Sequence, residues 1–131
     1  MSFPHLNKKT TILFITAYYP PHHGGGFGLR CRDVAEGLRR RGHSLTILTN
    51  RCALRGCCEH QSEERTLRLL ALRPAGDNPL RQILFDRREL LQVERVIRQV
   101  QPRVIYLWHM QNLSNAILPF LAGQPTPLIL D

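Results

Sequence analysis

Glycines and histidines gather near the start of the chain, where their chemistry would suit a bound ligand. The segment HHGGGFG places His22 and His23 beside Gly25, Gly26 and Gly28. Glycine lets the backbone approach a ligand closely, and exposed backbone N–H groups at a helix start favour an anion such as phosphate. An imidazole in the same place can bind a hydroxyl group or shuttle a proton. These residues predict a ligand-binding loop, although a flexible turn with exposed histidines would have the same composition.

A second candidate segment follows an apolar run later in the chain. His109 comes directly after the run Val104 to Trp108, and Asn112 lies three residues further on. His109 is the one candidate catalytic residue, with a structural role as its alternative, and Trp108 is expected in the core. No Cys–His, Ser–His–Asp or paired-carboxylate set has a convincing placement. The candidate substrate-binding residues are therefore His23, Gly25, Gly26, Gly28, His109 and Asn112.

The glycine-rich segment lies between two predicted strands and leads into a predicted helix. Ile12 to Ile15 is a short continuous apolar run, as expected for a strand covered on both faces. A helix is predicted from Leu29 to Arg41, and Gly42 stands where a glycine commonly follows a helix. Leu45 to Leu48 predicts the second strand. The apolar stripe of the helix is expected to comprise Cys31, Val34, Ala35 and Leu38.

The second half of the chain predicts three more strands and two more helices. Asn78 can cap a helix and Pro79 suits the first helical position, so a helix is predicted from Pro79 to Val100. A helix is also expected from Asn112 to Ala122, with a kink or break at Pro119. The three predicted strands are Leu67 to Leu72, Val104 to Trp108 and Leu128 to Leu130.

Alternating strands and helices predict an α/β, Rossmann-like fold with a doubly wound parallel sheet in the order 3-2-1-4-5. Ligands bind such sheets beyond the carboxyl ends of the strands, near the switch point between the first and fourth strands. The segments Tyr18 to Gly28 and His109 to Ser114 should meet there. Because the chain stops at Asp131, at the fifth strand, we expect a sheet that is incomplete at its C-terminus. Residues 1–131 would then form one N-terminal domain of a longer, two-domain chain.

Three motifs occur in an order that is typical of one enzyme family. They are Tyr19-Pro20-Pro21, Gly25-Gly26-Phe27-Gly28 and Arg41-Gly42-His43, and they accompany a strand, a helix and a second strand. In this respect the chain resembles the N-terminal, acceptor-side domain of a GT-B-fold glycosyltransferase of family 4, the glycosyl transferase group 1 type. The later run VQPRVIYLWHMQNLSNAILPFL resembles the fourth strand of that family and the helix after it.

The resemblance implies transfer of a sugar from a nucleotide-diphosphate sugar to an acceptor hydroxyl, usually with retained anomeric configuration. It implies no cofactor and no metal, since helix dipoles and basic side chains stabilise the diphosphate leaving group. In the family the donor binds mainly to the C-terminal domain, and a catalytic histidine often follows the fifth strand, which here would fall beyond Asp131. Residues 1–131 alone are therefore expected to be inactive, and their partners would be the nucleotide sugar, the acceptor and the missing C-terminal domain.

Two other functions compete with this one. A stand-alone Rossmann-like module that binds a phosphorylated ligand or a partner protein would need the same fold. A dinucleotide-dependent dehydrogenase fits less well, because its dinucleotide-binding motif requires the sequence G-x-G-x-x-G directly after the first strand. Here some eight residues separate Ala17 from Gly26 and Gly28, and the second strand ends in Thr49 and Asn50, with no acidic residue for a ribose.

The net charge of +8 comes almost wholly from arginine. Such a balance suits an anionic membrane surface, and the chain has no pattern typical of nucleic-acid binding. Compositional bias with solvated helix faces would give the same charge, so a peripheral place at the inner face of the membrane is one of two interpretations. The N-terminus lacks the long apolar run of a signal peptide, so we expect a cytoplasmic protein with reduced thiols. The cluster Cys52, Cys57, Cys58 and His60 does not have a recognised zinc spacing, and no metal site is predicted from it.

Overall fold

The computed structural model describes residues 9–20, 26–51 and 65–131. These residues form one sheet of five strands in the order β3-β2-β1-β4-β5. Every neighbouring pair is parallel, which confirms the predicted Rossmann-like α/β fold and its strand order. The strands are β1 (Thr11–Ile15), β2 (Ser44–Asn50), β3 (Thr66–Leu70), β4 (Val104–Leu107) and β5 (Leu128–Leu130).

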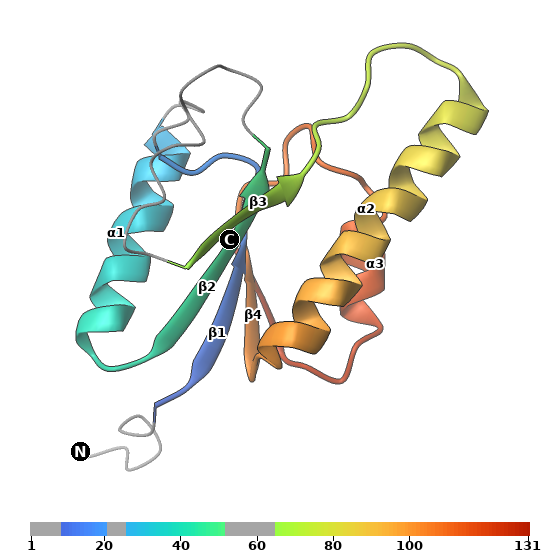
Figure 1. Cartoon of the computed structure of the whole chain (residues 1–131). Coiled ribbons are helices and arrows are strands. Elements are labelled where there is room, and N and C mark those ends of the chain that lie inside the picture. The colour runs from blue at the N-terminus through green and yellow to red at the C-terminus, as the bar shows by residue number, and fades with distance from the viewer. Residues whose placement is uncertain (1–8, 21–25, 52–64) are drawn as a thin grey trace.

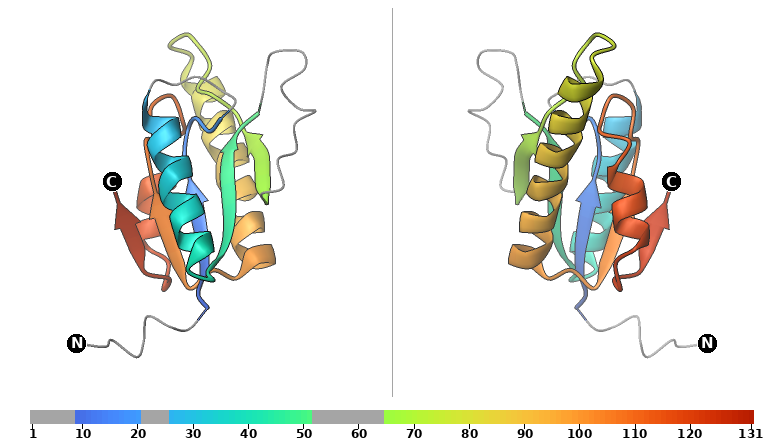
Figure 2. Two further views of the ribbon diagram at one scale, coloured as in Figure 1. Left: turned by 90° about the vertical axis from the view of Figure 1, so that its left-hand side faces the viewer. Right: turned by 90° about the vertical axis from the view of Figure 1, so that its right-hand side faces the viewer.

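Helices cover both faces of the sheet, as a doubly wound fold requires (Figures 1 and 2). Helix α1 (Gly26–Arg40) lies on one face, and α2 (Pro79–Val100) and α3 (Ile117–Ala122) lie on the other. Side chains alternate along β1: Phe14 packs on the α1 side with Cys31, whereas Leu13 packs on the α2 side with Val93. The strand is therefore apolar at successive positions because both of its faces are buried.

Helix α2 has the bounds that the sequence predicts. The side chain of Asn78 caps it by accepting hydrogen bonds from the backbone N–H groups of Leu80 (3.1 Å) and Arg81 (3.3 Å). At its end Gln101 adopts a left-handed conformation with φ of 48°, and its N–H donates to the carbonyl of Ile97. Local capping signals thus fix both ends of this helix.

Two predicted helix starts are wrong. Helix α1 begins at Gly26 rather than at Leu29, so Gly26 and Gly28 belong to its first turn and not to the loop before it. Helix α3 begins at Ile117 rather than at Asn112. Pro119 then lies in the first turn, where its missing N–H costs no helical hydrogen bond, and it does not break the helix.

Smaller differences follow from packing. Val34, expected on the apolar stripe of α1, is 38% exposed, while Cys31 and Ala35 are buried as predicted. Strand β3 ends at Leu70 instead of Leu72, since the chain turns toward the start of α2. Trp108 lies one residue beyond β4, yet it is buried as expected, and its ring stacks on that of Tyr106 at a centroid distance of 4.6 Å.

Candidate functional site

The two segments predicted to meet at the switch point do so among the described residues. The N–H of Ala17, after β1, donates to the carbonyl of His109, after β4, at 2.9 Å. The side-chain amide of Asn112 donates to the hydroxyl of Tyr18 at 3.0 Å. Both contacts lie at the carboxyl ends of the central strands, where parallel sheets bind ligands.

The backbone that leaves β1 is held by side chains from the neighbouring strands. Asn50, at the end of β2, is buried, and its amide donates to the carbonyl of Ala17. Arg68 of β3 donates to the carbonyl of Pro20 at 2.7 Å. The hydroxyl of Thr16 donates to the carbonyl of Tyr18 at 3.1 Å. These bonds fix the path of the chain beside the switch point before any ligand arrives.

The two described glycines of the candidate set have different surroundings. Gly26 is exposed, and a Cβ added there would meet no atom within 4 Å. Gly28 is buried, and a Cβ added there would lie 3.3 Å from the carbonyl oxygen of Tyr18. Packing alone therefore explains a glycine at position 28, because α1 approaches the chain after β1 closely there. The other members of the motif, His22, His23 and Gly25, lie outside the described residues.

His109 and Asn112 each lie against Tyr18 at this edge of the sheet. His109 is half-buried, its Nε2 atom lies 2.9 Å from Oε1 of Gln111, and its ring centroid lies 6.4 Å from that of Tyr18. Asn112 is exposed and adopts a left-handed conformation with φ of 66°. An imidazole, a phenol and an amide therefore converge, and together they offer donors and acceptors suited to hydroxyl groups.

The segment after β4 also makes hydrogen bonds to the loop after β3 and to helix α2. The N–H of Arg73 donates to the carbonyl of Asn112 at 2.6 Å, and the Arg73 guanidinium donates to the carbonyl of Leu113 at 3.0 Å. The hydroxyl of Ser114 donates to Oδ1 of Asp86 on α2 at 2.6 Å. Residues 109–116 are thus placed by contacts to β1, to the loop after β3 and to α2.

A buried carboxylate on α2 is the main group that the sequence prediction missed. Glu89 is 1% exposed, and its carboxylate accepts the N–H of Ala71, directly after β3, at 2.9 Å. Burial raises the pKa of Glu89 above its ordinary value of 4.5, while the hydrogen bond from Ala71 and the nearby Arg51 lower it. A signal existed, since Glu89 continues the helical spacing of the apolar stripe four residues before Val93.

Metal and membrane-spanning features can be assessed only where the chain is described. Within residues 9–20, 26–51 and 65–131, no group of three or more His, Cys, Asp or Glu side chains could hold a metal ion. In the same ranges no helix combines the length and the apolar character needed to cross a bilayer. The cluster Cys52, Cys57, Cys58 and His60 lies outside them.

Comparison with known proteins adds one partial match. No family model matches the chain. An uncharacterized glycosyltransferase of Methanocaldococcus jannaschii is 42% identical over 38 residues, which make up 29% of this chain and 10% of the relative. The chain is similar in part to a glycosyltransferase. The match spans a tenth of that relative's length, and it supports a general glycosyltransferase-like role.

Proposed function

We propose that the chain is the N-terminal, acceptor-side domain of a GT-B-fold glycosyltransferase of family 4. The parent enzyme would move a sugar from a nucleotide-diphosphate sugar to an acceptor hydroxyl with retained configuration. The observation that carries the proposal is the junction of Tyr18, His109 and Asn112 at the switch point of the sheet. The partial similarity to a glycosyltransferase and the Rossmann-like fold support it.

The end of β2 favours this reading over a dinucleotide-dependent oxidoreductase. A dinucleotide site would need an acidic side chain there to bind the ribose hydroxyls. The residue present is Asn50, whose buried amide already donates to the carbonyl of Ala17. Gly26 and Gly28 lie inside the first turn of α1, and Gly28 packs against the backbone of Tyr18. Gly28 therefore has a packing role in a close helix-to-loop contact, which does not require a pyrophosphate.

In this proposal the donor substrate is held chiefly by a C-terminal domain and the acceptor chiefly by the residues described above. The reaction uses neither cofactor nor metal. His23, Gly25, Gly26, Gly28, His109 and Asn112 remain the proposed substrate-binding residues of this domain, with His109 as its one candidate catalytic residue. A stand-alone module that binds a phosphorylated ligand or a partner protein is the alternative.

Transfer assays on the natural gene product test the proposal. We expect the full product to release nucleoside diphosphate from at least one nucleotide-diphosphate sugar when an acceptor is supplied, and residues 1–131 alone to release none. His109→Ala should lower kcat/KM by about tenfold or more, the effect of losing one important polar contact in the site. Asp33→Ala, exposed on α1, is the matched control and should leave kcat/KM unchanged.

Two outcomes would contradict the proposal. If the full product transfers no sugar from a broad panel of donors, the stand-alone binding module becomes the better explanation. If residues 1–131 alone transfer sugar at a substantial rate, the division of labour between two domains is wrong.

A second role is favoured by the outer face of α2, and we propose that this face rests on an anionic membrane surface in the cytoplasm. Leu80, Ile83, Leu84 and Leu91 are each more than half exposed. The same helix exposes five arginines: Arg81, Arg87, Arg88, Arg95 and Arg98. Apolar side chains beside arginines are typical of helices that lie in the interface of anionic bilayers.

Sedimentation with vesicles tests this contact. We expect the chain to pellet with vesicles that contain phosphatidylserine and to stay in solution with phosphatidylcholine alone. Arg87→Glu combined with Leu84→Glu should abolish the binding, because it reverses a charge and removes an exposed apolar side chain. Arg30→Glu on α1 is the matched control. Equal binding to both kinds of vesicle, or none, would exclude the proposed surface.

A further inference from the structure

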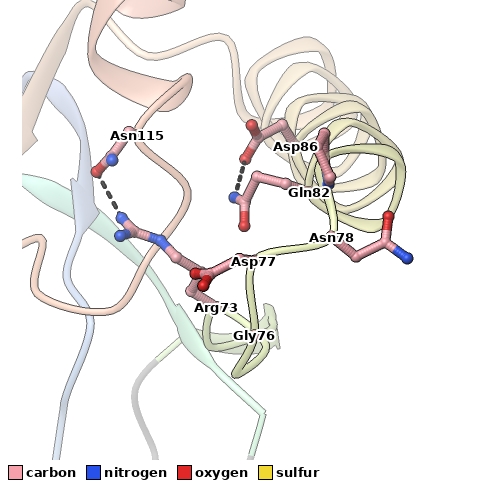
Figure 3. Close-up of a pocket in the computed structure, with 8 residues that line it drawn as sticks. Arg73, Gly76, Asp77, Asn78, Gln82, Asp86 and Asn115 are labelled. Carbon is pink, nitrogen blue, oxygen red and sulfur yellow. Dashed lines mark hydrogen bonds between the residues drawn. The ribbon is translucent and has the colours of Figure 1, made fainter.

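A polar pocket of about 430 Å³ lies beside the switch point (Figure 3). Its walls come from the loop between β3 and α2, from the first turns of α2 and from the segment after β4. Its volume falls within the range of about 300–1,000 Å³ that small-molecule sites occupy. None of its side chains belongs to the set predicted from the sequence. The polar residues that line it are Arg73, Asp77, Asn78, Gln82, Asp86 and Asn115.

Hydrogen bonds between the lining residues hold the pocket in shape. The guanidinium of Arg73 donates to Oδ1 of Asn115 at 2.6 Å, and the amide of Gln82 donates to Oδ1 of Asp86 at 3.3 Å (Figure 3). Ser114 donates to the same oxygen of Asp86 at 2.6 Å. Side chains that are positioned in advance lose little freedom when a ligand binds, which favours affinity.

The same residues keep hydrogen-bonding capacity that no described residue takes up. Among the described residues, Oδ2 of Asp86 accepts no hydrogen bond, and Nη1 of Arg73 and Nδ2 of Asn115 donate none. The pocket therefore combines an acceptor with a full charge and donors on the opposite wall. A hydroxyl group both donates and accepts, so a ligand with several hydroxyl groups can satisfy both walls.

The charges of the pocket decide the class of ligand. Two carboxylates, Asp77 and Asp86, face one guanidinium, that of Arg73, whose Nη2 is already bonded to Asn115 and to Leu113. The two carboxylates outweigh the one guanidinium, so the lining repels a phosphate or carboxylate ligand. A cation would be attracted, but it could not accept hydrogen bonds from Nη1 of Arg73 and Nδ2 of Asn115, the donors that no described residue takes up. Three amides complete the lining and carry no charge. The balance favours a neutral molecule with several hydroxyl groups.

The pocket and the switch-point junction share a wall. Asn112 contacts Tyr18 on one side, while Asn115, three residues further on, lines the pocket on the other. The N–H of Arg73 donates to the carbonyl of Asn112, so the two regions are joined directly. We propose that this pocket binds a neutral sugar or polyol group of the acceptor, which leaves another hydroxyl of the acceptor at the junction. That the ligand is the acceptor of a sugar transfer rests on the proposed function, whereas the binding of a neutral polyhydroxyl group to the pocket does not.

Chemical-shift mapping by NMR on residues 1–131 tests the proposal. The neutral probes are D-glucose, D-galactose, D-mannose and glycerol, and the anionic probes are inorganic phosphate and glucose 6-phosphate. We expect at least one neutral probe to shift the backbone signals of Arg73, Gln82, Asp86 and Asn115 in a saturable way. Phosphate should leave these signals in place.

Substitutions of residues that line the pocket test whether the neutral probe binds there. Asp86→Ala should weaken binding of the neutral probe by about tenfold or more, the loss that accompanies removal of a hydrogen bond to a charged group. Asn115→Ala should weaken it by about two- to tenfold, the loss for a hydrogen bond between uncharged groups. Asp86 also contacts Ser114, so Asn115, which is exposed, provides the variant that keeps the fold. Asp33→Ala on α1 should bind as the unchanged chain does.

Three results would contradict the proposed ligand or its place in the pocket. Saturable shifts by phosphate but by no neutral probe would make the pocket an anion site, and no shifts by any probe would mean that it holds none of these ligands. Neutral binding that survives Asn115→Ala and Asp86→Ala would place the site elsewhere. A pocket that binds sugar in a protein without transferase activity would refute the proposed function alone, whereas transferase activity without binding here would refute the pocket alone.

Discussion

Replacing Glu89 with alanine is expected to lower the free energy of unfolding by about 1–3 kcal/mol, the range for leaving a buried polar partner without its hydrogen bond. Glu89 is 1% exposed and accepts the N–H of Ala71 at 2.9 Å, where the chain leaves β3. Alanine would remove that acceptor and leave a cavity between α2 and the sheet. Urea unfolding of the two proteins, followed by circular dichroism, measures the difference.

Glutamine at the same position separates the hydrogen bond from the charge. Glu89→Gln keeps an oxygen that can accept from Ala71 and removes the carboxylate whose burial is unfavourable. We therefore expect Glu89→Gln to be at least as stable as the unchanged chain at neutral pH. If Glu89→Gln is destabilised as strongly as Glu89→Ala, the hydrogen bond to Ala71 is not what Glu89 contributes.

The difference in stability between Glu89→Gln and the unchanged chain should depend on pH in a definite direction. Burial raises the pKa of Glu89 in the folded chain above 4.5, its ordinary value, although Ala71, Arg51 and Arg88 oppose the shift. The folded state therefore binds the proton more readily than the unfolded state does. The contribution of Glu89 to the stability falls as the pH rises from 4.5 through the folded pKa and is constant above it. The advantage of Glu89→Gln over the unchanged chain should grow over that window, and an advantage independent of pH would contradict the shift.

Glu89 also connects the fold to the proposed pocket. Its bond to Ala71 fixes the chain two residues before Arg73, and Arg73 lines the pocket and holds the segment after β4. Loss of Glu89 should therefore disturb Arg73 even in variants that still fold. A carboxylate buried for this purpose is costly in itself, so its value lies in the position that it gives to the loop.

The fold was predictable because each element carries its own local signal. Asn78 and Pro79 mark the start of α2, and the apolar run Ile12 to Ile15 marks a strand buried on both faces. The alternation of strands and helices then predicts a doubly wound sheet with this strand order. The meeting of Tyr18 with Asn112 needs only that order, since both follow the carboxyl ends of adjacent strands.

The side chains of the pocket could not be predicted in the same way. Arg73 follows a predicted strand and Asn115 lay in a predicted helix that in fact begins at Ile117, and the two meet only because the sheet brings their segments together. Glu89 was missed because a glutamate on a helix is normally solvated, and its burial depends on the N–H of Ala71 that it meets. The first turn of α1 was misplaced because glycines at 26 and 28 predict a loop, whereas the helix begins at Gly26 and brings Gly28 against the backbone of Tyr18.

Valine in place of Gly28 is expected to destabilise the chain by about 1–3 kcal/mol, the usual effect of overfilling a packed site. A Cβ at this position would lie 3.3 Å from the carbonyl oxygen of Tyr18 and 3.5 Å from Cδ of Pro20. The two branches of valine extend further into the same space. The loop cannot easily retreat, because Asn50 holds the carbonyl of Ala17 and Arg68 holds that of Pro20. Thermal and urea unfolding measure the loss.

Gly37 provides the matched control on the same helix. A Cβ added at Gly37 would meet no atom within 4 Å, so Gly37→Val changes only the helix propensity. Valine is a better helix former than glycine by roughly 0.4 kcal/mol, so this variant should be neutral or slightly more stable. Equal destabilisation of the two variants would mean that the cost at Gly28 is not steric. Because Tyr18 supplies both the carbonyl that Gly28 approaches and the hydroxyl that Asn112 contacts, Gly28→Val should also displace the NMR signals of Tyr18 and Asn112. Gly37→Val should leave those signals in place, which ties the close approach of α1 to the geometry of the junction itself.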